Sequence, residues 1–420
     1  MGQRSSSPVQ VQGTVDPGFE SVKEMFERNF ARGAEESAQL CVYVEDRKVV
    51  DLWCSLTNPS YSGDTLHNVF SSGKSLTAIA MASLVDRGLV TYGDKITQHW
   101  PEFGQNGKEE LTVADLMRHE AGLAQFDTPL NVEDTLRENI KKNAIGAVIE
   151  KEECHWPKVG KRDYHSLSRG WIANEIFRRA DPKQRTIGEY LAEDVAGPLN
   201  ADVFVGVPSS RYEDYAPGRE MAFTTAVRES MKTNMGGGAL DIGFMDFMGI
   251  LNMFRKFADG AQKPTFHPYE NYDLKKIGLL FNQDVIRRGE TSSANSNCSA
   301  RGLARVAAAM ANGGSSAGVE VLSPGAWEQL HRDPVEAPIF NIWPTFFTQG
   351  GVNRFEEEEG VGRGGYYGWF GYGGSVFQWD PKLKIGFAYT PSLLYWFDLT
   401  NNRGRLLQQE VTKCVKNMKK

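Results

Sequence analysis

The sequence has 420 residues, of which 40% are hydrophobic and 24% are charged, and its formal net charge at pH 7 is −6. This length supports a large hydrophobic core, and the small negative charge without a basic run argues against a nucleic-acid partner. No apolar run approaches the roughly 18 residues of a membrane-spanning helix, and the N-terminus lacks the apolar stretch of a secretory signal. These features predict a globular protein of the cytoplasm.

The N-terminal segment, residues 1–13, is polar and rich in Ser and Gln, which predicts a flexible tail. Its first residues, Met1 to Ser6, also fit the pattern for N-myristoylation with Gly2 as the acceptor. A single myristoyl chain on Gly2 would attach the protein only weakly to a membrane.

A helix and a strand hairpin are predicted next. Apolar residues recur at helical spacing from Pro17 to Gly33, and the glycine is a stop signal. Residues 39–44 and 49–53 are apolar runs on either side of the turn at 45–48, which is typical of an antiparallel hairpin.

The middle of the chain is rich in predicted helices. The longest extends from Ser71 to Asp86, and shorter ones are predicted at 112–119, 170–180 and 301–311. A second hairpin, 375–379 and 384–390, flanks Asp380-Pro381, and residues 401–416 end the chain as a helix.

This order of elements predicts an α+β fold rather than alternating βαβ units. We expect strands from both chain ends, about 35–60 and about 368–395, to pair into one antiparallel sheet. The helix-rich region, about 71–330, would then be an insertion. Residues 14–420 would form a single catalytic unit, in which Glu356–Gly365 is the best candidate for a mobile loop.

Ser71 and Lys74 form a Ser-x-x-Lys pattern at the start of a predicted helix. Residues three apart lie on one helix face, so the two side chains are neighbours. A serine nucleophile needs a base and oxyanion donors, and a lysine is a base when burial or positive charge lowers its pKa. The pattern also fits a helix-capping Ser71 followed by an exposed Lys74.

The surrounding sequence favours the first interpretation. The chain reads Asn-Val-Phe-Ser-Ser-Gly-Lys-Ser-Leu-Thr-Ala over residues 68–78, Leu-Thr-Val-Ala-Asp-Leu-Met-Arg-His over 111–119, and Ala-Gly-Leu over 121–123. From Phe19 to the C-terminal helix it resembles the β-lactamase-related serine hydrolases, which include class C β-lactamases, D-Ala-D-Ala carboxypeptidases and esterases. The resemblance implies a β-lactamase/penicillin-binding-protein-like fold, a Ser71 acyl-enzyme, and no metal or cofactor.

The segment Tyr164-His165-Ser166 lies where this family carries Tyr-x-Asn or a variant. By resemblance, Tyr164 is the second base or a proton relay, and Ser166 stands where other members have the substrate-contacting Asn. In this family the residue at the position of His165 is not the base. The pattern also fits Tyr164 as a core tyrosine with a satisfied hydroxyl.

The third family motif, Lys-Thr-Gly or His-x-Gly, aligns with Trp369-Phe370-Gly371, followed by Tyr372-Gly373. Trp369 replaces the cationic or histidine residue, as in some carboxylesterases of the family, which argues against an anionic substrate carboxylate there. The glycines permit a close approach of the backbone. By family geometry the oxyanion hole is the N–H of Ser71 plus one from this strand, with Tyr372 as its donor. The stretch also fits a glycine-rich turn with Trp369 in the core.

Three short patterns are rejected as functional motifs. Residues 314–318 match Gly-x-Ser-x-Gly but follow a predicted helix rather than a strand, so a turn is expected. Residues 360–365 match Gly-x-Gly-x-x-Gly but follow four glutamates, which would repel a pyrophosphate. Asn297 opens a glycosylation sequon, which has no use without secretion.

Cysteine and histidine usage indicates a reducing compartment and no metal site. The seven histidines form no His-Glu-x-x-His motif and no cluster with cysteine. Five scattered cysteines without paired spacing favour free thiols: Cys41, Cys54, Cys154, Cys298 and Cys414.

The leading hypothesis is a carboxylesterase-like serine hydrolase that acts on a small ester or amide. A β-lactamase, or a D-amino-acid peptidase or transesterase, is the alternative within the family. A catalytically silent scaffold is the alternative of another class. The oligomeric state and the physiological substrate stay open.

Overall fold

The computed structural model describes residues 10–155, 162–234, 242–243, 245–252, 269–270, 277–339, 343–356, 363–398 and 401–419. Gly2 and residues 357–362 of the predicted mobile loop lie outside this part of the chain. The predicted tail, residues 1–13, is too long at its C-terminal end. Gln12 and Gly13 pair with Trp53 and Leu52 at the edge of the main sheet.

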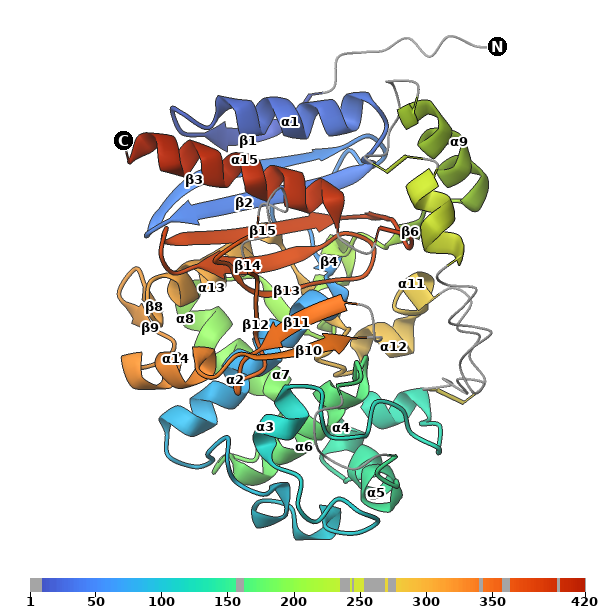
Figure 1. Cartoon of the computed structure of the whole chain (residues 1–420), viewed down its shortest axis with the longest axis vertical. Coiled ribbons are helices and arrows are strands. Elements are labelled where there is room, and N and C mark those ends of the chain that lie inside the picture. The colour runs from blue at the N-terminus through green and yellow to red at the C-terminus, as the bar shows by residue number, and fades with distance from the viewer. Residues whose placement is uncertain are drawn as a thin grey trace.

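The main sheet has nine strands in the order β1-β3-β2-β15-β14-β13-β12-β11-β10, and all neighbours are antiparallel (Figure 1). The two chain ends meet where β2 pairs with β15, with Cys41 opposite Ala388. The expected α+β sheet built from both ends of the chain is therefore confirmed. Its strands are β1 Gln12–Val15, β2 Ser37–Val44, β3 Arg47–Ser55, β10 Val335–Ile339, β11 Trp343–Phe347, β12 Asn353–Arg354, β13 Tyr367–Phe370, β14 Val376–Asp380 and β15 Ile385–Pro391.

Helices cover both faces of this sheet. Figure 1 shows α1 (Glu20–Ala31) and α15 (Asn402–Met418) side by side over one face. Residues such as Leu40 and Phe387 pack under these helices in one buried cluster. On the other face, α13 (Ala300–Ala311) lies directly on the sheet, because Gly386 has no side chain: a Cβ there would lie 2.5 Å from the Ala308 backbone nitrogen.

The rest of the helix-rich region packs around α2 (Lys74–Asp86), in which eleven of thirteen residues are buried. Three short strands, β4 (His67–Asn68), β7 (Ser296–Cys298) and β5 (Val203–Val205), form a small sheet beside it. Further helices are α3 Val113–Met117, α4 Arg137–Ile140, α5 Ala144–Lys151, α6 Ser168–Ala180, α7 Ile187–Tyr190, α8 Gly197–Leu199, α9 Phe223–Asn234, α11 Ile277–Leu280, α12 Asp284–Arg288 and α14 Pro324–His331. Two minor pairs are β6 Arg219–Glu220 with β16 Leu393–Leu394, and β8 Ser315–Ser316 with β9 Val319–Glu320.

The structure differs from the sequence predictions at two places that matter for the site. The helix predicted from Ser71 begins as a 3₁₀ turn, Phe70–Gly73, and becomes α-helical at Lys74. The strands β10 to β12 were not predicted, because their segment mixes polar residues and prolines with the apolar ones. These strands extend the sheet beyond β13, and residues of β10 and β11 line part of the cavity described below.

The structure supports the rejection of these patterns where it describes their residues. Residues 314–318 include a tight hairpin turn between β8 and β9, with Ala317 and Gly318 at positive φ. Asn297 of the sequon is buried in β7. Among the described helices none is long and apolar enough to cross a bilayer.

Candidate active site

Ser71 lies on a constrained turn between β4 and α2. The residue before it, Phe70, has a φ of +46°, which is uncommon for an aromatic residue. Two bonds hold this backbone: the Phe70 N–H donates to Asn68 Oδ1 at 2.8 Å, and the Val69 N–H donates to the Ser296 carbonyl at 2.8 Å. The turn presents the Ser71 side chain to a cavity, since Ser71 is only half-buried while its neighbours Ser72 and Gly73 are buried.

Lys74 lies behind Ser71 and is almost fully buried, with 1% of its surface exposed. Its Nζ is 3.3 Å from Ser71 Oγ and donates to the carbonyls of Ser166 at 2.7 Å and Ser293 at 3.0 Å. Within the described part of the chain no carboxylate forms an ion pair with it. Burial, and secondly the charge of Arg169, hold the pKa of Lys74 well below the ordinary lysine range. The arrangement therefore favours a neutral amine that can accept a proton.

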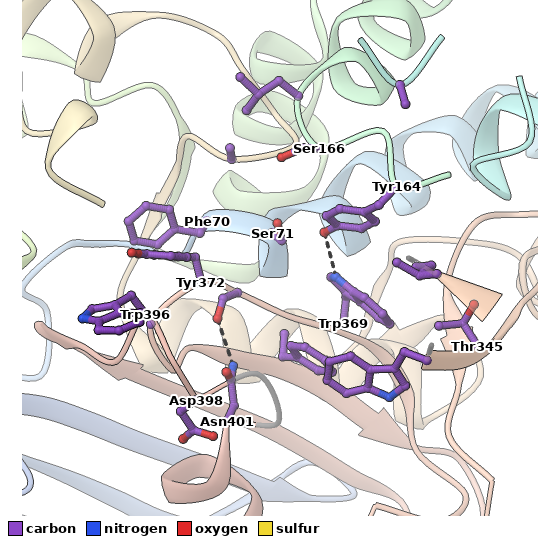
Figure 2. Close-up of a pocket in the computed structure, with 18 of the residues that line it drawn as sticks. Phe70, Ser71, Tyr164, Ser166, Thr345, Trp369, Tyr372, Trp396, Asp398 and Asn401 are labelled. Atoms are coloured by element: carbon purple, nitrogen blue, oxygen red, sulfur yellow. Dashed lines mark hydrogen bonds between the residues drawn. The ribbon is translucent and has the colours of Figure 1, made fainter. Parts of the chain in front are cut away.

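Tyr164 completes the group around Ser71. Lys74 Nζ lies 4.7 Å from the centre of the Tyr164 ring, and the phenol oxygen accepts a hydrogen bond of 2.9 Å from Trp369 Nε1 (Figure 2). Burial raises the pKa of Tyr164 to about 12, while hydrogen bonds with Ser71 and Trp369 and the charge of Arg169 oppose this rise. The Lys74 amine and the Tyr164 phenol thus both lie next to the Ser71 hydroxyl.

The end of β13 is fixed against the turn that carries Ser71. Ser375 Oγ donates to the Val69 carbonyl at 2.7 Å, and Asn401 Nδ2 donates to the carbonyls of Gly371 and Ser375 at 2.9 Å each. A Cβ on Gly371 would lie 2.2 Å from the Val69 oxygen, so only glycine permits this approach. Within the described residues, the backbone N–H groups of Ser71 and Tyr372 have no acceptor. They are therefore free to bind an oxyanion.

These residues open onto a cavity of about 460 Å³ with a wall rich in aromatic residues. Figure 2 shows Ser71 between two groups: Phe70, Tyr372 and Trp396 on one side, and Tyr164 and Trp369 on the other. Among the described lining residues there is no lysine or arginine. The lining comprises Phe70, Ser71, Ala124, Gln125, Asp163, Tyr164, Ser166, Leu167, Phe281, Ala294, Ile339, Trp343, Thr345, Trp369, Phe370, Gly371, Tyr372, Gly373, Tyr395, Trp396, Asp398 and Asn401.

The structure brings all the sequence-predicted site residues together, apart from Gly2. All but Lys74 line the cavity, and Lys74 contacts it through Ser71. Ser166 has two roles, since its side chain lines the cavity and its carbonyl holds Lys74. His165 points away, with Nε2 accepting from the Leu123 N–H at 3.1 Å, and burial lowers its pKa to about 4.

Sequence reasoning missed several residues of the site. Asn401 and Ser293 act through contacts between distant segments, so no local pattern marks them. The aromatic residues Phe281, Trp343 and Trp396 line the cavity from segments without a recognised motif. Arg169 carried no local signal either, because its burial in the first turn of α6 is seen only in the structure.

The chain is similar to known proteins in sequence and in fold. The family model for Beta-lactamase matches residues 22–410. The chain is 28% identical to the esterase/beta-lactamase LipL of Mycobacterium tuberculosis over 384 residues, which cover 90% of this chain and 81% of LipL. A penicillin-binding protein homologue from Caulobacter crescentus superposes with a TM-score of 0.75 at 25% identity, covering 96% of this chain and all of the other. A family VIII carboxylesterase superposes with a TM-score of 0.76 at 24% identity, covering 97% and 100%.

Proposed function

This chain belongs to the beta-lactamase family, and we propose that it is a carboxylesterase that forms an acyl-enzyme on Ser71. The observation that carries the proposal is the wall of the cavity. It is rich in aromatic residues, has Trp369 in place of a cationic residue, and among its described residues contains no lysine or arginine. Such a wall favours uncharged esters over substrates that carry a carboxylate.

The proposed reaction starts with activation of Ser71. Its hydroxyl proton passes to Lys74 Nζ, directly or through the Tyr164 oxygen, since both lie against Ser71. Ser71 Oγ forms a bond to the carbonyl carbon of the ester. The negative charge that develops on the carbonyl oxygen is stabilised by the backbone N–H groups of Ser71 and Tyr372.

Three proton transfers complete the cycle. The bond from the carbonyl carbon to the alcohol oxygen breaks, and the alcohol leaves with the proton held by Lys74 or Tyr164. Water then attacks the acyl-enzyme and gives one proton to the same base. The acid is released when Ser71 Oγ regains its proton from that base.

The test combines a serine-directed label with turnover. The wild type is treated with a fluorophosphonate probe and with p-nitrophenyl butyrate, beside Ser71→Ala. Ser72→Ala is a matched control, because Ser72 is the adjacent serine but its hydroxyl is 3.0 Å from Ser375 Oγ in the buried interior. We expect labelling and hydrolysis to disappear in Ser71→Ala and to persist in Ser72→Ala. Activity that survives Ser71→Ala would contradict the nucleophile assignment, and an unreactive wild type would favour the scaffold alternative.

Lactam hydrolysis is the second candidate, because the name of the M. tuberculosis relative includes both activities. Nitrocefin, whose carboxylate the cavity wall disfavours, is the substrate that separates the two. Turnover of nitrocefin at a higher kcat/KM than p-nitrophenyl butyrate would reverse the preferred assignment.

A further inference from the structure

Arg169 is a fully buried arginine without a carboxylate partner. It lies in the first turn of α6, has 0% of its surface exposed, and forms no ion pair within the described part of the chain. Two other buried arginines are paired, Arg403 with Glu35 at 2.8 Å and Arg162 with Glu120 at 2.6 Å, whereas Arg363 bonds to Gln408 and the Asn401 carbonyl. An isolated buried charge is costly, so its retention calls for an explanation.

The guanidinium instead bonds to two backbone carbonyls near the candidate active site and lies against His119. Nη1 is 3.1 Å from His119 Nε2, and Nη2 donates to the carbonyls of Lys74 at 3.2 Å and Gly351 at 3.0 Å. A Cβ on Gly351 would lie 2.9 Å from Nη2, so the β11–β12 turn encloses the group closely. The guanidinium is therefore fixed against the backbone carbonyl of Lys74.

The groups that face this charge provide no compensating anion. On α2 and the loop after it, the titratable groups are Lys74 and Tyr92, and burial raises the pKa of Tyr92. After α3 the neighbours are His119, whose pKa is held well below the usual range by burial and by Arg169, and Glu120, which pairs with Arg162. The segment before α6 supplies Tyr164 and the neutral His165. The β11–β12 turn supplies only the Gly351 carbonyl.

Lys74 and Arg169 thus lie in one buried region, where two positive charges would have no free carboxylate within the described part of the chain. A guanidinium gives up its proton far less readily than an amine or a phenol, even though burial lowers the pKa of Arg169 to about 10. The unfavourable charge is relieved either when Lys74 loses its proton or when Tyr164 becomes a phenolate. Both changes create a base next to Ser71.

We propose that Arg169 is a positioning residue whose fixed buried charge keeps Lys74 unprotonated and favours the phenolate of Tyr164, and so sets the pH at which Ser71 is activated. This role rests on the proposed function, because it concerns the base of the same reaction. Arg169 does not touch the substrate, since it does not line the cavity. Its effect reaches the substrate through Lys74 and Tyr164.

The experiment measures the pH profile of kcat/KM for p-nitrophenyl butyrate in the wild type, Arg169→Met and Arg169→Lys. Loss of the charge raises the pKa of Lys74 or of Tyr164. In Arg169→Met we therefore expect the rising limb of the pH profile to move to higher pH by about one unit or more. Activity would then fall about tenfold near pH 6 and much less on the alkaline plateau. Arg169→Lys retains the charge and is expected to keep the limb near its wild-type position.

Controls separate this role from a purely structural one. Arg178→Met on the same helix removes an arginine that is paired with Glu175 at 2.6 Å and does not line the cavity, so its limb should not move. Arg169→Gln keeps an N–H donor without the charge and replaces Arg169→Met if that variant does not fold. An unmoved limb in the neutral variants, or an equal loss in them and in Arg169→Lys at every pH, would overturn the proposal.

The rate of fluorophosphonate labelling over the same pH range distinguishes a failure of the role proposed for Arg169 from a failure of the proposed function. If the wild type is labelled and its limb does not depend on residue 169, only the role of Arg169 is wrong. If the wild type is neither labelled nor active, the proposed function fails and the role of Arg169 fails with it.

Discussion

Replacement of Trp369 by phenylalanine tests how the third motif contributes to activation of Ser71. The substitution keeps an aromatic ring among Phe347 and Phe370, whose ring centres lie 5.1 and 4.6 Å away, but it removes the Nε1–H that donates to Tyr164 at 2.9 Å. Because this bond favours the phenolate, its loss raises the pKa of Tyr164 further. The phenolate of Tyr164 is then less populated at neutral pH.

The size of the effect follows from the charge on the acceptor. A hydrogen bond to a charged group contributes about 1.5–3 kcal/mol. At about 1.4 kcal/mol for each factor of ten in rate, Trp369→Phe is expected to lower kcat by about 10- to 150-fold. The smaller ring should lower the free energy of unfolding by about 1–2 kcal/mol. An increase in KM is not expected, since the lost bond is made to Tyr164 and not to the substrate.

The assay is steady-state hydrolysis of p-nitrophenyl butyrate, with thermal denaturation to confirm folding. Trp343→Phe is the matched control, because Trp343 lines the same cavity and packs on Phe370 but forms no hydrogen bond with Tyr164. A Trp369→Phe enzyme whose kcat stays within twofold of the wild type would refute the reasoning. An equal loss of kcat in Trp343→Phe would also refute it, since the smaller ring alone would then explain both losses.

Three further predictions concern the base, the oxyanion donors and the substrate. Lys74→Met should abolish hydrolysis and raise Tm near pH 7: the buried amine has a lowered pKa, so the unfolded chain binds more protons and the stability of the wild type increases only as the pH rises toward the ordinary lysine range. Thermal denaturation near pH 7 and near pH 10 checks this, because the difference in Tm should shrink at the higher pH. Gly371→Ala should lower kcat about 100-fold or more, since its Cβ would lie 2.2 Å from the Val69 oxygen and displace the donor strand. Gly325→Ala, with no heavy atom closer than 4.0 Å, should be harmless, and an active Gly371→Ala would contradict the oxyanion assignment. Finally, kcat/KM for p-nitrophenyl hemisuccinate should be at least about tenfold below that for the neutral butyrate ester, because the described wall has no cation to pair with the carboxylate. Equal rates would show that the wall does not select against charge.

The elements near the chain ends were predictable because their signals are local. Apolar spacing predicted α1 and α15, and the paired apolar runs predicted β2 with β3 and β14 with β15. The strands β10 to β12 lacked such a signal. They exist because their backbone hydrogen bonds are satisfied by pairing onto β13, and because Arg162, from far earlier in the chain, donates to the carbonyls of Val335 and Thr345.

The sequence by itself determined the pairing of Ser71 with Lys74, since residues three apart at a helix start are neighbours whatever the rest of the chain does. Family resemblance added Tyr164 and the β13 segment, but it could not give their contacts. Only the tertiary structure decided that Trp369 donates to Tyr164 and that two serine carbonyls hold Lys74. It also decided that Arg169, which has no ion pair within the described residues, donates to the Lys74 carbonyl. Each of these contacts joins segments far apart in the chain. The pKa values that the chemistry needs depend on burial and on such contacts, so no local pattern encodes them.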